Sequence, residues 1–266
     1  MSNASAGRNL GIALAAALAL TSGSAANAAT CGNDGGGFSA WKAATAVEAK
    51  SRGIGARGIA ALSGATYATA TINADRNMKS FKLSLGEFMQ RRGSSTIVGQ
   101  GRGLKAANSG LFAEIQKRYG VPAGPLVAIW GMESGFGSSV GNQNVLSATA
   151  TLAYDCRRSA FFTDQLYAQL KLIDRGVLSP SSRGAMQGEI GQTQFLPKTE
   201  LQYGVGDLNS KAGALMSTAN FLRAHGWVAG AGYQPGQTNF AAIQAWNDAS
   251  VYQQSIAIMG AQIDGK

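Results

Sequence analysis

Apolar residues recur every three or four positions along most of this sequence, and the alternation typical of a half-buried strand is rare. This spacing places apolar side chains along one face of an α-helix. Glycine follows several of the periodic segments, where it commonly ends helices. We therefore expect an all-α or strongly α-rich fold with little β structure. The segments that predict helices are 38–74, with breaks at Gly53, Gly55, Gly58 and Gly64, then 111–119 before Gly120 and Pro122, 125–133, 212–222 before Gly226, and 252–263.

Length and composition indicate a folded protein of one large domain or two small ones. Of the 266 residues, 45% are hydrophobic and 14% are charged, which is enough apolar material for a core and too little charge for a disordered chain. The chain has 23 basic and 14 acidic residues, a net charge of +9. This balance favours anionic partners such as nucleic acid, acidic lipid or an acidic polysaccharide.

Residues 1–28 have the features of a secretory signal peptide. Arg8 precedes an apolar run from Leu10 to Leu20, and small residues follow as far as Ala29. The pattern ends in an Ala-x-Ala cleavage site before Ala29, and the run is shorter than the roughly 20 residues that cross a bilayer. We expect an exported chain without a transmembrane segment, which argues against nucleic acid as its partner. A lipoprotein site at Cys31 is the alternative, disfavoured because residues 28–30 lack the usual bulky aliphatic residue.

The two cysteines of the chain, Cys31 and Cys156, both follow the predicted signal. An even number of cysteines in an oxidising compartment predicts a disulfide. The alternative is a metal site, but two cysteines and one distant histidine do not complete a ligand set. We therefore expect a Cys31–Cys156 disulfide.

One carboxylate lies at an unusual position. A helix that begins near Pro125 places Leu126, Ile129, Trp130 and Glu133 on one side, so Glu133 ends an apolar stripe. A carboxyl group held against apolar surface is costly to ionise, so its pKa rises and it can donate a proton near neutral pH. The alternative is a glutamate that caps the helix or forms an ion pair at its end.

Three further segments carry residue types that suit a sugar polymer. Residues 155–158 place Arg157 and Arg158 just before Phe161 and Phe162, although a solvated charge pair beside core phenylalanines fits equally well. Residues 188–197 are rich in amide side chains, which donate and accept hydrogen bonds as sugar hydroxyls require; an ordinary Gly-Pro loop is the alternative. Residues 246–252 combine an indole, an amide and a phenol, while Asn247 or Ser250 could instead cap the last helix.

Read in order, these segments resemble the lytic murein transglycosylase B family. The resemblance covers roughly residues 80–260. It implies a lysozyme-like α-rich fold and cleavage of the peptidoglycan strand between N-acetylmuramic acid and N-acetylglucosamine. The motifs that carry it are Tyr119-Gly120-Val121-Pro122, residues 129–137 around Glu133, residues 152–155 with Arg157 and Arg158, residues 191–197, Ala224-His225-Gly226-Trp227, and Trp246-Asn247 with Tyr252.

The resemblance also assigns roles to single residues. It makes Glu133 the catalytic acid and base. The substrate-binding residues that it implies are Arg157 and Arg158 along the groove, Gln194, Phe195 and Leu196 on its floor, Asn247 and Tyr252 facing the glutamate, Trp246 where tyrosine is common, and Phe88 and Phe161, also at positions where relatives often have tyrosine.

The domain organisation, cofactors and partners follow from the same resemblance. We expect a signal peptide at 1–28, an N-terminal helical segment at 29–79 and the lysozyme-like catalytic domain at 80–266. Calcium-binding relatives have an acidic loop after the floor motif, whereas residues 205–211 include one carboxylate, so we expect no metal site. No cofactor is implied. The expected protein is a periplasmic monomer whose partner is the peptidoglycan glycan strand.

The implied reaction uses one carboxylate, although most glycosidases use two. Glu133 would protonate the leaving oxygen, the substrate's acetamido group would support the positive centre, and the glutamate would then take the proton of the muramyl 6-hydroxyl to close a 1,6-anhydro ring. Two alternatives stay open. A hydrolytic muramidase would need water positioned by Asp155 or Glu189, and a non-catalytic wall-binding protein would not need Glu133.

Overall fold

The computed structural model describes residues 30–77 and 83–266. Helices make up most of these residues, and strand pairing is limited to one two-residue ladder and isolated bridges. The predicted mainly α fold is therefore confirmed. The predicted signal peptide at residues 1–28 lies outside the described residues, as does the boundary predicted between residues 79 and 80.

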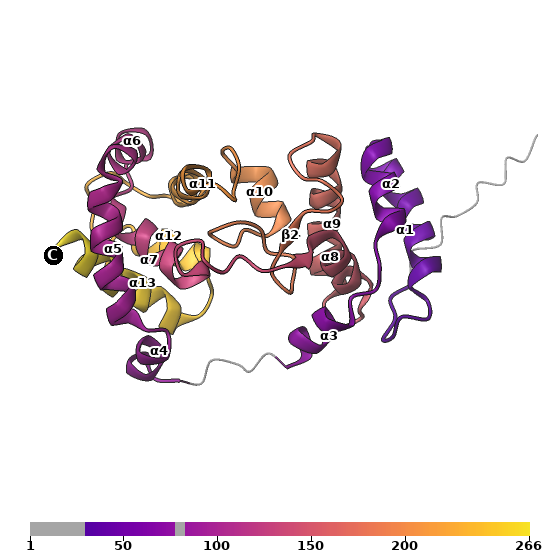
Figure 1. Ribbon diagram of the computed structural model, residues 1–266, viewed down its shortest axis with the longest axis horizontal. Coiled ribbons are helices and arrows are strands. Elements are labelled where there is room, and N and C mark those ends of the chain that lie inside the picture. Colours follow the sequence, from indigo (N-terminus) through magenta and orange to yellow (C-terminus); the bar gives the residue numbers. More distant parts are fainter. Residues whose placement is uncertain (1–29, 78–82) are drawn as a thin grey trace, which may run out of the picture.

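Five helices form one end of the molecule (Figure 1). In this part, α2 packs along α9, while α1 and α3 contact α8. The helix pair α8 and α9 is itself closely packed and continues toward the centre of the molecule. The bounds are α1 Phe38–Ser51, α2 Ala56–Gly64, α3 Thr69–Arg76, α8 Val145–Tyr154 and α9 Ser159–Asp174.

The other end of the molecule is built around α7, which packs against α13 and α5 (Figure 1). Every residue of α7 is buried except Glu133, which is half-buried. The helix is therefore enclosed on all sides, whereas the predicted apolar stripe required only one buried face. The bounds in this part are α4 Leu85–Arg91, α5 Ser94–Ala107, α6 Ser109–Tyr119, α7 Ala123–Ser134 and α13 Ser250–Asp264.

The remaining elements of the described chain are three helices and the short ladder. Strands β1 and β2 are antiparallel, with Gln143 opposite Gly184. Helix α11 contacts α6, α7, α10 and α12. The bounds are β1 Gln143–Asn144, β2 Arg183–Gly184, α10 Pro197–Tyr203, α11 Lys211–Ala224 and α12 Phe240–Trp246.

Glycine ends helices at most of the predicted positions, with one exception. Gly120 follows α6 at φ 74° and Gly226 follows α11 at φ 92°, in the left-handed region that glycine tolerates. The predicted break at Gly58 is wrong, because Gly58 lies inside α2. A Cβ atom there would lie 2.8 Å from the carbonyl oxygen of Leu170. Gly58 therefore allows α2 to approach α9 closely.

The N-terminal part of the described chain is covalently attached to the loop between α8 and α9. Cys31 and Cys156 form a disulfide, which confirms the predicted pairing. Beside it, the N–H of Gly32 donates to the carbonyl of Tyr154 at 3.0 Å, and the N–H of Cys156 donates to the carbonyl of Gly32 at 3.3 Å. The disulfide thus lies beside two backbone hydrogen bonds that join the same two segments.

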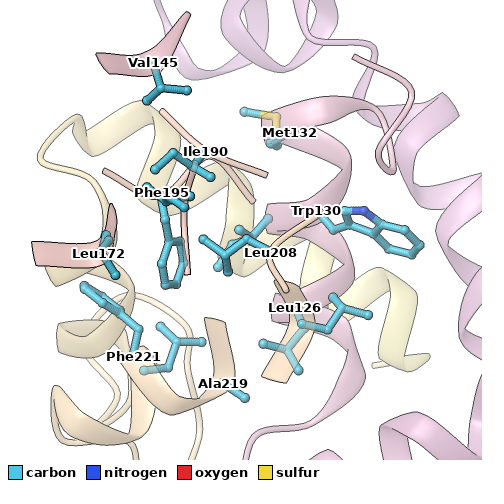
Figure 2. Close-up of a cluster of buried hydrophobic side chains, with 14 of the residues drawn as sticks. Leu126, Trp130, Met132, Val145, Leu172, Ile190, Phe195, Leu208, Ala219 and Phe221 are labelled. Atoms are coloured by element: carbon cyan, nitrogen blue, oxygen red, sulfur yellow. The ribbon is translucent and has the colours of Figure 1, made fainter. Parts of the chain in front are cut away.

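The hydrophobic core continues directly beneath the helix that carries Glu133 (Figure 2). Leu126 and Trp130 on α7 belong to this cluster, as do Phe195 and Phe221. All four side chains are at most 7% exposed. Among the described residues, no helix combines the length and apolar character needed to cross a lipid bilayer.

Candidate active site

Glu133 lies in the last turn of α7, beside a cleft of about 300 Å³. The helix ends immediately afterwards at Gly135, which has φ 56°. The carboxyl group of the one incompletely buried residue of α7 is therefore presented to this cleft. The residues that line the cleft are Glu133, Glu189, Gln194, Phe195, Leu196, Thr199, Phe221, Ala245, Trp246 and Asn247.

Two donors from the C-terminal helices hold the Glu133 carboxyl group. The hydroxyl of Tyr252 on α13 donates to Oε1 at 2.5 Å, and the indole Nε1 of Trp246 on α12 donates to the same oxygen at 3.2 Å. Both bonds reach Oε1, and none that is found among the described residues reaches Oε2 of Glu133. The two oxygens of Glu133 thus differ, and Oε2 is the one available for proton exchange with a ligand.

The environment of Glu133 favours its protonated form. Burial raises the pKa of the Glu133 carboxyl, and this effect outweighs the hydrogen bonds from Tyr252 and Trp246, which lower it. The charge of Arg92 also lowers this pKa, whereas the charge of Glu189 raises it. A raised pKa is the property needed in a carboxylic acid that donates a proton near neutral pH.

The floor of the cleft comes from a tight loop between Ile190 and Phe195. These two residues pair through backbone hydrogen bonds of 2.8 and 3.0 Å. Within the loop, Gln194 has φ 52°, a conformation that is rare for a residue with a side chain. The amide Nε2 of Gln194 donates to the carbonyl of Gly191 at 2.8 Å. Backbone strain of this kind often accompanies functional sites, and here it places Gln194 at the cleft.

Gln192 attaches this loop to α7. Its Oε1 accepts from Nε1 of Trp130 at 2.9 Å, and its Nε2 donates to the carbonyl of Asn209 at 2.6 Å. The hydroxyl of Ser134, next to Glu133 in the chain, donates to the carbonyl of Gln192 at 2.5 Å. The sequence predicted an amide-rich segment here, but it did not indicate that Gln192 faces the helix while Gln194 faces the cleft.

Three aromatic rings form the apolar wall of the cleft. The centroids of Trp246 and Phe195 are 5.3 Å apart, and those of Trp246 and Phe221 are 5.0 Å apart. These contacts fix the indole whose N–H donates to Glu133. Phe221 was not predicted at the site, because no motif around it signals a binding residue.

Three quarters of the chain match one known protein family. Residues 37–236 match the family described as the Transglycosylase SLT domain. The chain belongs to this family. The match includes α1–α3 and α7, which carries Glu133, and ends before α12 and α13. The predicted division at residue 80 stays a prediction.

Known relatives agree with this assignment. A segment of 121 residues is 35% identical to Membrane-bound lytic murein transglycosylase B of Escherichia coli strain K12. The aligned segment covers 42% of this chain and 34% of that protein, so the match spans about a third of the relative's length.

Solved transglycosylase structures share the fold. SltB3 from Pseudomonas aeruginosa, in complex with NAG-anhNAM-pentapeptide, matches with a TM-score of 0.78 and 29% identity, over 86% of this chain and 80% of that chain. The Escherichia coli lytic transglycosylase Slt35, in complex with bulgecin A, matches with a TM-score of 0.73 over 90% and 96% of the two chains, at 21% identity. The lysozyme-like transglycosylase fold implied by the sequence is thereby confirmed.

Asn247 lies at the cleft, but not as a cap of α13. Its Oδ1 accepts from the N–H of Ala249 at 3.0 Å, within the turn that joins α12 to α13. Its carbonyl accepts from Nε2 of Gln253 at 2.8 Å. Ser250 is the first residue of α13, and no side chain caps that helix. Capping by Asn247 or Ser250, the alternative to a substrate contact, does not occur, because the Asn247 side chain is bonded within the turn instead.

The two arginines of the transglycosylase motif are ion-paired with Asp75. Arg157 and Arg158 both contact the carboxylate of this α3 residue, whose side chain is 1% exposed. Arg157 also donates to the carbonyl of Asp75 at 3.0 Å. Their side chains are 44% and 30% exposed, and neither lines the cleft. The sequence did not predict Asp75 as their partner, since it is 82 residues from Arg157.

The two phenylalanines predicted as substrate contacts lie in different environments. Phe161 is 49% exposed, and its ring packs edge-on against Phe162 at 5.0 Å. Phe88 is 1% exposed and belongs to the core. The guanidinium of Arg92 lies 5.6 Å from the Phe88 ring. This placement argues against a substrate contact for Phe88, because a buried ring has no free face for a sugar.

Of the other two carboxylates considered for the chemistry, one lies at the cleft. Asp155 is 2% exposed and accepts from Arg76 at 2.6 Å, so it serves an ion pair away from the cleft. Glu189 lines the cleft with Glu133. Burial raises the pKa of Glu189, while hydrogen bonds from the backbone and the charge of Arg158 lower it.

Residues 205–211, where the family resemblance would place a calcium loop, have a poor donor set for calcium. In residues 205–211, Oδ1 of Asp207 accepts from the N–H of Asn209 at 2.9 Å and from its amide at 3.1 Å. No cluster of three or more histidine, cysteine, aspartate or glutamate side chains suited to a metal occurs in the described part of the chain. Calcium needs six to eight oxygen ligands, which this segment does not offer.

Proposed function

We propose that this protein is a lytic transglycosylase that cleaves peptidoglycan glycan strands between N-acetylmuramic acid and N-acetylglucosamine. The observation that carries the proposal is the Glu133 carboxyl group, which lies at the cleft with a raised pKa and two donors on one oxygen. Family membership supports it, as does the related SltB3, whose structures contain NAG-anhNAM-pentapeptide and NAG-NAM-pentapeptide.

In the first step, protonated Glu133 acts as a general acid. Its Oε2 proton passes to the glycosidic oxygen, and the bond from that oxygen to the muramyl C1 breaks. The acetamido group of the substrate stabilises the positive charge that develops at C1. The hydrogen bonds from Tyr252 and Trp246 stabilise the carboxylate that remains on Glu133.

In the second step, the same carboxylate acts as a general base. It removes the proton of the muramyl 6-hydroxyl, and the oxygen of that hydroxyl bonds to C1. The product has a 1,6-anhydro ring, Glu133 is protonated again, and no water is consumed. One residue thus completes the proton transfers that two carboxylates share in most glycosidases.

The neighbouring residues are assigned to substrate binding. Gln194 and Asn247 provide amide groups at the cleft, Leu196 and Phe195 its floor, and Trp246 an aromatic wall. Arg157, Arg158 and the exposed Phe161 extend the binding surface beyond the cleft. The charge of Arg158 acts on Glu189, which links this arginine electrostatically to the cleft.

We further propose that the protein acts as a monomer in the periplasm, after export by the signal at residues 1–28. The disulfide supports an oxidising compartment. It also disfavours a lipoprotein anchor at Cys31, because the sulfur of this residue is bonded to Cys156.

The experiment that tests the function digests purified peptidoglycan in ¹⁸O-labelled water and analyses the products by mass spectrometry. The proposal predicts 1,6-anhydro ends without label from the wild type. Glu133→Gln retains the shape of the side chain but cannot transfer the proton, so its rate should fall by about 10⁴-fold, the upper part of the range for general acid–base catalysis. An active Glu133→Gln variant would refute the role of this residue.

A hydrolytic muramidase is the second candidate, and the position of Glu189 favours it. This carboxylate lines the same cleft as Glu133, so it could activate a water molecule on the other side of the bond. Labelled reducing ends, lost in Glu189→Gln, would support this reaction instead. Unlabelled anhydro ends that persist in Glu189→Gln would exclude it.

A further inference from the structure

Helices α7 and α13 carry the two ends of the Glu133–Tyr252 hydrogen bond, and they pack antiparallel. Glu133 is near the end of α7 and Tyr252 near the start of α13, while Asp264 at the end of α13 meets the start of α7. We propose that Asp264 is a positioning residue, which sets the register of α13 on α7 and so holds the Tyr252 hydroxyl on Glu133. This inference rests on the proposed function.

Asp264 caps the catalytic helix from a neighbouring helix. Its Oδ1 accepts from the N–H of Gly124, in the first turn of α7, at 2.9 Å. The side chain of Pro122, the residue at the N-terminal cap position of α7, makes no such bond. A carboxylate here satisfies one of the free N–H groups at the helix start and interacts favourably with the helix dipole.

The Asp264 carboxylate is itself held by donors from two other segments. Nζ of Lys105 on α5 donates to Oδ1 at 3.1 Å, and the hydroxyl of Tyr233 donates to Oδ2 at 2.8 Å. The side chain of Asp264 is 6% exposed. A buried carboxylate with three donors has a defined position, because moving it would leave charged and polar groups unpaired.

Helices α7 and α13 are in close contact, so the bond between Gly124 and Asp264 fixes how far one helix lies along the other. A Cβ atom at Gly124 would collide with the carbonyl of Gly260 on α13. Asp264 and Tyr252 are twelve positions apart, about 18 Å along a helix. A slip of one residue would move α13 by about 1.5 Å along its axis and turn the face that carries Tyr252 by about 100°. The rotation would take the Tyr252 hydroxyl away from the Glu133 carboxyl group that it contacts at 2.5 Å.

The test replaces Asp264 with alanine and follows the ionisation of Glu133 in the full-length protein. Because the Tyr252 hydrogen bond lowers the pKa of Glu133, its loss should raise that pKa. Asp264→Ala should therefore shift the Glu133 titration to higher pH, in the same direction as Tyr252→Phe. The titration is measured by NMR of protein labelled with ¹³C at glutamate Cδ, with the signal assigned by its loss in Glu133→Gln.

Two further variants separate positioning from simple stabilisation. Asp264→Asn retains an acceptor for Gly124 and should recover part of the shift. In a Tyr252→Phe background, Asp264→Ala should shift the Glu133 titration no further, since the bond through which it acts is already gone. If the Asp264 charge acted directly on Glu133, its removal would lower the Glu133 pKa, which is opposite to the upward shift expected from the loss of the Tyr252 bond.

Asp174 provides the matched control. It lies at the end of α9 and accepts from the N–H groups of Gly55 and Gly58, at 2.5 and 2.7 Å, at the start of α2. Asp174→Ala should lower thermal stability without moving the Glu133 titration. An unshifted titration in Asp264→Ala, or an equal shift in Asp174→Ala, would overturn the inference. If the wild type releases no anhydro product, the proposed function fails, whereas this titration still tests Asp264.

Discussion

Tyr252 and Glu133 are 119 residues apart in the chain, and the Tyr252 hydroxyl donates to Oε1 of Glu133 at 2.5 Å. Tyr252 is 5% exposed and its own pKa is raised well above the ordinary value, by burial and by the neighbouring carboxyl. The phenol therefore stays protonated and acts as a permanent donor. Burial disfavours the carboxylate form of Glu133, and the Tyr252 hydrogen bond favours it. These two effects together set the pKa of Glu133.

Tyr252→Phe should move the alkaline limb of the pH–rate profile upward. The first step that we propose requires protonated Glu133, so activity should fall as pH rises through its pKa. A hydrogen bond to a charged group contributes about 1.5–3 kcal/mol, which corresponds to an upward shift of about one to two pH units when it is lost. The measurement is kcat/KM against pH on a soluble glycan strand. A downward shift would contradict the assigned role of the phenol.

Trp246→Phe should shift the same limb in the same direction by a smaller amount. The indole donates at 3.2 Å to the oxygen that Tyr252 contacts at 2.5 Å, so it stabilises the carboxylate less. Phenylalanine retains most of the packing against Phe195 and Phe221. The same pH profile checks this, with thermal unfolding as the control for packing. A shift larger than that of Tyr252→Phe would show that the indole is the stronger partner.

The sequence predicted those features that depend on local pattern. Gly120 ends α6, and Glu133 lies at the end of an apolar helix, because helical spacing and glycine at a cap act over a few residues. The ion pairs of Asp75 and the inward orientation of Gln192 could not be predicted in this way. Both depend on segments that meet through tertiary packing, and neither residue type signals its partner along the chain.

Asp75→Ala should destabilise the protein and leave Arg157 and Arg158 without their carboxylate. Removing one partner of a fully buried pair costs about 3–5 kcal/mol, and the partial exposure of these arginines lowers our expectation to about 2 kcal/mol. Urea unfolding measures the loss. In a double-mutant cycle, Arg157→Ala should cost much less in the Asp75→Ala background. Additive losses would mean that the two residues stabilise the fold independently.

Reduction of the Cys31–Cys156 disulfide should lower stability substantially. The two cysteines are 125 residues apart. In the chain-entropy description, a loop of this length contributes about 5 kcal/mol. The double variant Cys31→Ser/Cys156→Ser should therefore unfold at lower urea concentration than the oxidised protein, as should the wild type with reductant. Reductant should have no effect on the double variant. Equal stability of the oxidised and reduced wild type would contradict the prediction.

Glu200 should make the protein less stable as pH rises toward neutrality. It is 5% exposed, its Oε2 has no hydrogen-bond partner among the described residues, and burial with the nearby charge of Asp207 raises its pKa to about 7. The folded state therefore keeps the proton up to about pH 7, whereas the unfolded chain loses it near its ordinary value of about 4.3. The free energy of unfolding should fall between these values, by up to about 3 kcal/mol.

Glu200→Gln should remove this dependence, because the amide has nearly the same shape and no charge. The variant should be more stable than the wild type at pH 8. At pH 4 the wild-type carboxyl is mostly protonated in both states, so the two proteins should differ little. Urea unfolding at both pH values measures the difference. Glu114→Gln, at an exposed position on α6, is the control and should change stability little at either pH. A gain from Glu200→Gln that is equal at both pH values would assign the effect to packing rather than to ionisation.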